Sequence, residues 1–206
     1  MNMLTEKQSV CVYVGAAYNF AQNEILPEYA KKRMEKISNL SVRDEKKAGF
    51  GVLNYALEHM GIDADVRNCF LSMSGKPIHK RFSFSISHSK GLVAVAVCLL
   101  GNVGIDIEPL ESRERTDRVL KRILCDGEEG TDSLVLWTRK EAVFKCRGNS
   151  KSFKPNKIDT KDEKTKSIKF AFEEKDFVLS VSAEGREINA EFFLAPSGEH
   201  LTFSEI

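Results

Sequence analysis

Two acidic residues stand two positions apart in the sequence Gly-Ile-Asp-Ile-Glu-Pro, at Asp106 and Glu108. On a β-strand, residues i and i+2 lie on the same face, so both carboxylates project together while Ile105 and Ile107 face a core. Carboxylates held this close repel each other unless a cation lies between them. The pair indicates either a site for a hard divalent cation such as Mg²⁺, or a strand end whose acids are solvated.

A third acid, Glu141, falls on the same stripe of a predicted helix as Trp137 and Phe144. A carboxylate between apolar neighbours is partly buried, and it then needs a positively charged partner or a metal ion. The nearest candidate partners are Lys145, at i+4, and Lys140. An ordinary ion pair on the surface of the helix is the alternative interpretation.

A histidine with small polar neighbours, His88, lies where a predicted strand ends, in the segment Ile-Ser-His-Ser-Lys-Gly. Hydroxyl groups, turn amides, an imidazole and an ammonium group at one turn can bind a phosphate. A lone histidine is more often structural, so both interpretations stand. Basic residues that could bind anions, or form a solvated face, are concentrated nearer the start of the chain: Lys31, Lys32, Arg33, Lys36, Arg43, Lys46 and Lys47.

The spacing of apolar residues predicts the elements that position these groups. Alternating or continuous apolar residues predict strands over residues 9–14, 81–87, 92–100, 103–108, 168–172, 177–181 and 188–194. Helical spacing predicts helices over residues 28–36, 41–60, 112–124 and 132–145. We expect Ser41 to cap the longest helix and Gly61 to end it, and Thr131 or Asp132 to cap the last helix.

The order of these elements predicts the fold class. Strands that follow strands, with helices inserted singly, are typical of an α+β fold with mainly antiparallel sheets. Each half of the chain holds about three strands and one long helix, so we expect two similar lobes, residues 1–101 and 102–206. The lysine-rich segment 150–166 is expected to be a solvated loop.

Composition excludes several classes of protein. The chain has 206 residues, of which 42% are hydrophobic and 30% charged, which is enough apolar material for a core. A net charge of +1 argues against nucleic-acid binding. The longest apolar run, Leu92 to Leu100, is far shorter than the roughly 20 residues that cross a bilayer. Five cysteines without CxxC spacing, and no signal-peptide pattern, lead us to expect a cytoplasmic protein without a disulfide framework or zinc site.

Taken in order, four segments resemble the motifs of the 4′-phosphopantetheinyl transferases. They are Gly75-Lys76-Pro77, Phe84 to Ser89, Gly104 to Glu108, and Trp137 to Lys145. The last two match the family's most diagnostic patterns, G-[IV]-D-[IVL]-E and W-x-x-K-E-[AS]-x-x-K. The motifs cover residues 75–145, and a length of 206 residues suits the two-lobed, surfactin-synthetase-activating type better than the half-length trimeric acyl carrier protein synthases.

This resemblance implies a pseudodimer of two α/β lobes with the active site at their interface, and it implies a reaction. Coenzyme A and Mg²⁺ bind, with Mn²⁺ as the other candidate ion, and a serine hydroxyl of an apo acyl or peptidyl carrier protein attacks the phosphate that bears pantetheine. The products are holo carrier protein and adenosine 3′,5′-bisphosphate. We expect a monomer whose partners are coenzyme A and a carrier protein, with no nucleic acid and no membrane. The alternatives are a non-catalytic coenzyme A- or carrier-binding protein and an unrelated Mg²⁺-dependent phosphohydrolase.

The resemblance also assigns roles to residues. Asp106, Glu108 and Glu141 are expected to hold Mg²⁺ on the pyrophosphate, and Lys145 to contact the phosphates. The proton of the attacking serine is expected to pass to Glu141 or to a water on the metal. The residues expected to bind coenzyme A are Lys140 in support of the phosphates, Ser87 and His88 near the 3′-phosphate, Gly75, Lys76 and Pro77 along the adenine, and Lys32 and Lys47 as 3′-phosphate cations.

Three departures from the family pattern stand out. Lys47 occupies a position where relatives usually have arginine, so bidentate pairing with phosphate would be lost there. An acid that relatives often carry ahead of the last motif corresponds to Glu128 or Glu129, or is absent. The expected glycine-rich stretch after the last motif has a single glycine, Gly148, which leaves the carrier preference open.

Overall fold

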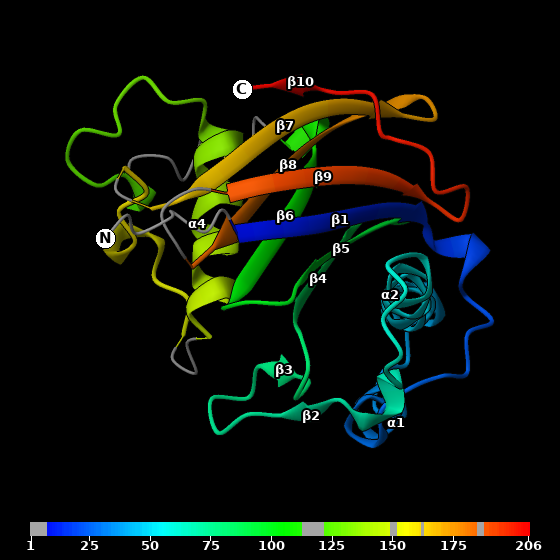
Figure 1. Cartoon of the computed structure of the whole chain (residues 1–206). Helices are drawn as coiled ribbons and strands as arrows, with labels where there is room; N and C mark the ends of the chain where they lie inside the picture. Colours follow the sequence, from blue (N-terminus) through cyan, green and yellow to red (C-terminus); the bar gives the residue numbers. More distant parts are fainter. Residues whose placement is uncertain (1–7, 113–121, 149–151, 162, 185–187) are drawn as a thin grey trace, which may run out of the picture.

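The computed structural model describes residues 8–112, 122–148, 152–161, 163–184 and 188–206 (Figure 1). The strands are β1 Gln8–Ala16, β2 Phe70–Leu71, β3 Pro77–Ile78, β4 Ser83–Ser89, β5 Leu92–Cys98, β6 Val103–Pro109, β7 Thr165–Phe172, β8 Lys175–Ala183, β9 Ile188–Ala195 and β10 Ser204–Glu205. The α-helices are α1 Glu28–Met34, α2 Leu40–His59 and α4 Ser133–Arg147. Most of the predicted helix over 112–124 lies outside the described residues.

The strands form two four-stranded sheets and a small hairpin. One sheet has the order β4-β5-β1-β9 and the other β10-β7-β8-β6, while β2 pairs with β3. All pairings are antiparallel except that of β1 with β9, which confirms the predicted α+β class with mainly antiparallel sheets. Because β9 joins the first sheet, the sheets do not divide between residues 1–101 and 102–206.

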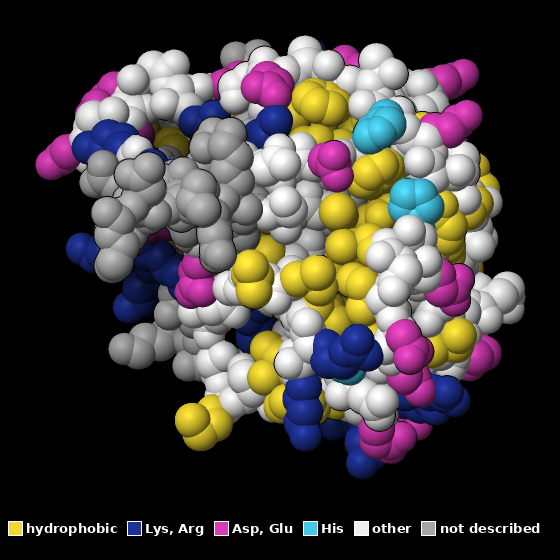
Figure 2. Space-filling view, in the orientation of Figure 1, with side chains coloured by type: hydrophobic (Ala, Val, Ile, Leu, Met, Phe, Trp, Pro, Cys, Tyr) yellow, Lys and Arg dark blue, Asp and Glu magenta, His cyan; other side chains and the backbone are white. Residues whose placement is uncertain are grey.

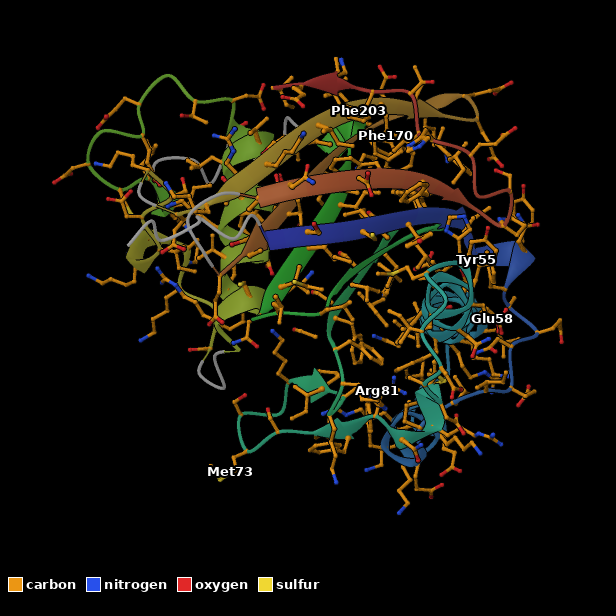
Figure 3. The ribbon with its side chains drawn as sticks, in the orientation of Figure 1. Tyr55, Glu58, Met73, Arg81, Phe170 and Phe203 are labelled. Carbon is orange, nitrogen blue, oxygen red and sulfur yellow. The ribbon has the colours of Figure 1, made fainter. Side chains whose placement is uncertain are left out.

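The two larger sheets pack against each other, and each carries a helix on its other face. Alternate side chains of both sheets share one core, for example Val12, Ala94, Ile105 and Leu179. Phe170 of β7, which is labelled in Figure 3, also belongs to this core. Helix α2 covers the outer face of the first sheet, and α4 packs on β6 and β8 of the second. The order of layers is therefore helix, sheet, sheet, helix.

Local signals explain where α2 begins and ends. The prediction that Ser41 caps this helix is wrong. The side chain of Asn39 accepts the hydrogen bond from the Val42 amide, and the helix begins at the residue after Asn39, Leu40. The predicted end at Gly61 is confirmed by its φ of +66°, a left-handed conformation that favours glycine. None of the helices within the described ranges is long and apolar enough to cross a membrane.

Two predicted elements near the site differ in extent. Strand β4 continues through His88 to Ser89, since the chain reverses only at Lys90 and Gly91, which have φ of +52° and +83°. This two-residue turn pairs β4 with β5. The expected solvated loop over 150–166 is partly buried where it is described. Only 5% of the surface of Ile158 and 9% of the surface of Thr160 are exposed to solvent.

Candidate functional site

A close contact between β6 and α4 builds the site. Gly104 of β6 faces α4 so closely that a Cβ atom there would lie 2.0 Å from the carbonyl oxygen of Ala142. Only glycine allows this approach. Since side chains alternate along a strand, Asp106 and Glu108 face the same way as Gly104 and lie along the helix that carries Glu141 and Lys145.

Asp106 is the most constrained of the acids. Its Oδ1 accepts hydrogen bonds from the Lys145 ammonium, at 2.7 Å, and from the Ser87 hydroxyl, at 2.9 Å. The side chain is almost fully buried, and its Oδ2 is buried without a hydrogen-bond partner among the described atoms. A buried carboxylate oxygen without a donor is costly, so this atom suits a cation.

Glu141 lies across from these groups on α4. Burial raises the pKa of its carboxyl to about 7, with further contributions from the charges of Asp106 and Glu108, while Lys145 lowers it. The alternative interpretation, a Glu141–Lys145 ion pair on the helix surface, does not describe the ion pair that Lys145 forms, which is with Asp106. Trp137 and Phe144 both pack edge-on against Phe153, and Trp137 lines the same cleft as Glu141.

A cleft of about 360 Å³ brings these groups together. Its walls are formed by β4, β6 and α4 and are lined by Ile86, Ser87, His88, Asp106, Ile107, Glu108, Trp137, Glu141 and Lys145. Three carboxylates and one ammonium group leave two net negative charges when all are ionised, which is the charge that one divalent cation would balance.

The donor set fits Mg²⁺ in an open rather than a closed site. Within the described ranges, no three His, Cys, Asp or Glu side chains come close enough to hold a metal ion by themselves. Mg²⁺ is commonly held by one or two carboxylates and completes its shell with water and substrate phosphate oxygens. The unpartnered oxygen of Asp106 and the mutual repulsion of the acids fit that kind of binding.

His88 is held by a helix of the first half of the chain. Its Nδ1 lies 3.0 Å from Oε2 of Glu45 on α2, and Oε1 of the same carboxylate accepts from the Gly91 amide. A carboxylate only accepts hydrogen bonds, so Nδ1 carries the proton, and Nε2 is an acceptor that becomes a donor only when the ring is protonated. Burial, together with Lys46, holds the pKa of His88 below its usual range despite Glu45.

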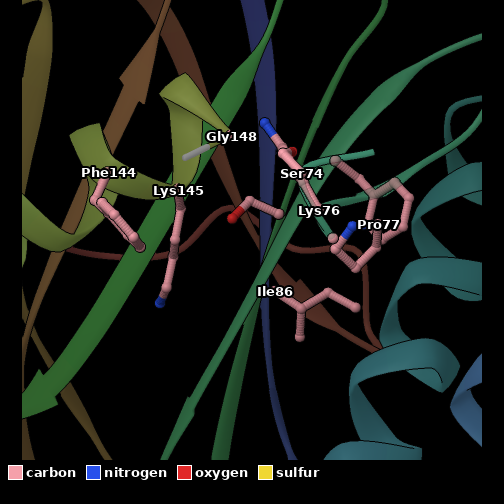
Figure 4. A pocket seen from close by; sticks show the side chains of 10 residues that line it. Ser74, Lys76, Pro77, Ile86, Phe144, Lys145 and Gly148 are labelled. Atoms are coloured by element: carbon pink, nitrogen blue, oxygen red, sulfur yellow. The ribbon is translucent and has the colours of Figure 1, made fainter. Parts of the chain in front are cut away.

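Two further cavities adjoin the cleft, and Ile86 lines all three. The larger, of about 290 Å³, is mostly apolar and lies between α4 and the β2–β3 hairpin. Figure 4 shows Phe144, Lys145 and Gly148 on the α4 side and Lys76, Pro77 and Ile86 on the other. The hairpin reaches out from the body of the molecule, with the fully exposed Met73 near its tip (Figure 3).

Lys76 anchors this hairpin to the second half of the chain. Its ammonium group donates to the carbonyl oxygens of Val103 on β6 and Cys146 on α4, each at 3.1 Å. Burial lowers the pKa of Lys76. The predicted segment Gly75-Lys76-Pro77 therefore lies beside the cleft, with the Lys76 charge committed to backbone carbonyls.

The third cavity, of about 170 Å³, is lined by both basic and apolar side chains. Arg33, Lys46 and His88 supply the basic groups, and Tyr29 and Phe50 are among the apolar ones. The Tyr29 hydroxyl is buried without a hydrogen-bond partner in the described structure. Lys and Arg side chains, with Asp and Glu side chains among them, lie on the lower part of the face drawn in Figure 2, where α1 lies in Figure 1.

Lys140 does not reach the cleft, contrary to the expectation that it supports the phosphates. Its side chain is fully buried on the other side of α4, 2.7 Å from Oε2 of Glu128, and it also donates to the Ile158 carbonyl oxygen. The Glu128 carboxylate accepts from the Cys125 and Thr160 amides as well. This ion pair fastens two loops to α4, and it identifies Glu128 as the buried acid of that region.

The two cations expected from the first half also lie elsewhere. Lys32 is exposed and pairs with Glu28, while Lys47 points to Glu24, at 2.7 Å. The structure instead places Arg33 and Lys46 beside His88. Helical spacing contained the signal for Lys46, because it stands four residues before the buried Phe50 and so shares the stripe that faces the sheet.

Taken together, a cluster of acids that suits a cation lies beside a lysine and a histidine. This arrangement defines a site suited to a phosphorylated ligand. Residues 102–195, which include β6 and α4, match the model of the 4′-phosphopantetheinyl transferase superfamily (ACPS). This match supports a transferase and, in general terms, the transfer of phosphopantetheine. No curated protein matches the chain.

Proposed function

We propose that the chain transfers 4′-phosphopantetheine from coenzyme A to a serine of an apo acyl or peptidyl carrier protein. The observation that carries the proposal is the convergence of Asp106, Glu108, Glu141 and Lys145 on one cleft, directly beside a second cavity with basic side chains. The match of residues 102–195 to the superfamily model supports the same reaction class.

The cleft is suited to the diphosphate of coenzyme A. Asp106 and Glu108, with or without Glu141, would hold Mg²⁺, and Lys145 would contact a phosphate oxygen. When bound, Mg²⁺ neutralises charge on the phosphoryl oxygens. Lys145 adds a donor whose position is already set by Asp106 and Ser87. Phosphoryl transfer depends mainly on such positioning and charge neutralisation.

The neighbouring cavities suit two parts of the 3′-phosphoadenosine end of the coenzyme. Arg33 and Lys46 would receive the 3′-phosphate, in place of the cations first expected at Lys32 and Lys47, and His88 would donate to it from Nε2 when its ring is protonated. Ser87 remains beside His88 on β4, although its hydroxyl is already engaged by Asp106 and Lys145. Gly75, Lys76 and Pro77 would pack along the adenine through backbone and aliphatic atoms.

Glu141 has two possible roles, and they are separable. As a third ligand of Mg²⁺ it would be needed for binding of the ion. As the acceptor of the serine proton it would be needed for turnover, and a pKa of about 7 in the metal-free protein suits a general base near neutral pH. If the Glu141→Gln variant binds Mg²⁺ and coenzyme A normally but fails to turn over, Glu141 is the acceptor of the serine proton.

Intact-mass spectrometry of a carrier protein tests the proposal. Incubated with coenzyme A and Mg²⁺, the protein should add one phosphopantetheine to the carrier serine. The Asp106→Asn variant should not, and its circular dichroism spectrum should be that of a folded protein. Binding of coenzyme A with no mass gain on several apo carriers would instead support a non-catalytic binding protein. Hydrolysis of coenzyme A without a carrier would support a phosphohydrolase.

A further inference from the structure

Strands β4 and β6 meet in an unusual way. They belong to different sheets, each is an edge strand of its own sheet, and they run side by side. Serines at every second position of β4 face β6 and form hydrogen bonds with it. We call these residues the serine row: Ser83, Ser85, Ser87 and Ser89.

The first half of the serine row contacts the backbone of β6. The Ser83 hydroxyl accepts from the Val103 amide at 3.3 Å, and the Ser85 hydroxyl accepts from the Ile105 amide at 3.2 Å. Each bond gives an edge amide of β6 a partner that a neighbouring strand would otherwise supply. These two bonds therefore fix the register of β6 against β4.

The second half of the serine row contacts the carboxylates. Ser87 donates to Oδ1 of Asp106 at 2.9 Å, and Ser89 donates to Oε2 of Glu108 at 3.2 Å. An ammonium group only donates, so the Ser87 hydroxyl accepts from Lys145 and must direct its proton to Asp106. Each of the two β6 carboxylates thus has one oxygen that accepts a hydrogen bond from a β4 serine, and the two serines stand two residues apart.

The Glu108 side chain has more freedom to move than that of Asp106. Asp106 is nearly fully buried, whereas Glu108 is partly exposed and has the longer, more flexible side chain. The charges of Asp106 and Glu141 on the same cleft repel it toward solvent. A hydroxyl donor on β4 opposes that movement.

We propose that Ser89 is a positioning residue, which keeps the Glu108 carboxylate directed into the cleft so that it contributes to binding a divalent cation with the diphosphate. The inference rests on the proposed function, because it concerns how the chain binds coenzyme A together with Mg²⁺. It assigns work at the cation site to the first half of the chain, outside the matched residues 102–195.

The experiment measures the magnesium gain, which we define as the Kd of coenzyme A in EDTA divided by its Kd in Mg²⁺, by calorimetry. Loss of a residue that orients a metal ligand typically costs 10–100-fold in metal affinity. Ser89→Ala should therefore lower the magnesium gain by about tenfold and leave the Kd in EDTA unchanged. Ser89→Thr, which keeps the hydroxyl, should restore most of the gain. Ser83→Ala removes a serine of the same row that contacts only backbone, and it should keep the gain.

Each outcome decides the proposal. A magnesium gain in Ser89→Ala equal to that of the wild type overturns it, and so does an equal loss in Ser89→Ala and Ser83→Ala, since that pattern reports a structural role of the row. Melting temperatures of the two alanine variants identify such a general effect. A wild type that binds no coenzyme A, or binds it without any magnesium gain, contradicts the proposed function itself, whereas a wild-type gain that Ser89→Ala retains overturns the positioning role alone.

Discussion

Replacing Glu141 by glutamine should stabilise the metal-free protein at pH 8, although it removes a residue of the site. The pKa of Glu141 is raised from 4.5 to about 7, first by burial and then by the charges of Asp106 and Glu108. Above pH 7 the folded protein must therefore hold an ionised carboxylate in an unfavourable place. Glutamine has nearly the same shape and carries no charge.

The magnitude follows from the size of this displacement. Each pKa unit corresponds to about 1.4 kcal/mol, and solvent screening of this partly exposed side chain reduces the total, so we expect roughly 1–2 kcal/mol. For a chain of this size that is a rise of roughly 3–6 °C in melting temperature. Because the folded-state pKa lies above the unfolded one, wild-type stability falls as the pH rises from 4.5 to 7, and the advantage of glutamine grows over the same window.

Thermal unfolding in EDTA at pH 5 and at pH 8 measures the effect. Glu141→Gln should match the wild type at pH 5 and exceed it at pH 8, while the control Glu174→Gln, at an exposed turn, should show no such difference. If Glu141 is a ligand of the ion, Mg²⁺ with coenzyme A should raise the melting temperature of the wild type more than that of Glu141→Gln, and if it is only the proton acceptor, both should rise equally. A glutamine variant that is no more stable than the wild type at pH 8 would refute the view that burial and neighbouring negative charge make the ionised Glu141 unfavourable.

Three further changes test other parts of the structure. Gly104→Ala should destabilise the protein by roughly 3 kcal/mol or more in urea unfolding, because its Cβ would collide with backbone atoms of α4; an unchanged unfolding midpoint contradicts this packing. Lys140→Met should lower the free energy of unfolding by about 3–5 kcal/mol, because it leaves Glu128 buried without its partner, and should leave the Kd of the folded protein for coenzyme A unchanged. Loss of affinity at full stability would instead place Lys140 at the phosphate site. Lys46→Ala should weaken coenzyme A binding by about tenfold, and dephospho-coenzyme A binding little, whereas Lys47→Ala should change neither; the opposite ranking would place the 3′-phosphate elsewhere.

Local pattern predicted most of the elements near the site. The alternation at Asp106 and Glu108 placed both acids on one face of β6, and their neighbours Ile105 and Ile107 are in the core as expected. The apolar stripe of α2 is also confirmed. The end of β4 was predicted too early, since His88 and Ser89 are polar and gave no sign that the strand runs on to a two-residue turn.

The positions of the cations depended on contacts between distant parts of the chain. Lys140 adjoins Glu141 in sequence, yet one step along a helix rotates a side chain by about 100°, and the partner that fixes it, Glu128, comes from a separate loop. Lys46 and Lys47 are separated in the same way, with Glu24 holding the second. The parallel pairing of β9 with β1 likewise joins the two ends of the chain, and no local pattern signals it.

Calorimetric titration of coenzyme A into the wild type and into Asp106→Asn, each in Mg²⁺ and in EDTA, tests the central claim most directly. If the acids of β6 and α4 bind a divalent cation together with the diphosphate, Mg²⁺ should strengthen binding to the wild type by at least about tenfold and should have little effect on Asp106→Asn. Equal affinity of the wild type in Mg²⁺ and in EDTA would contradict the account.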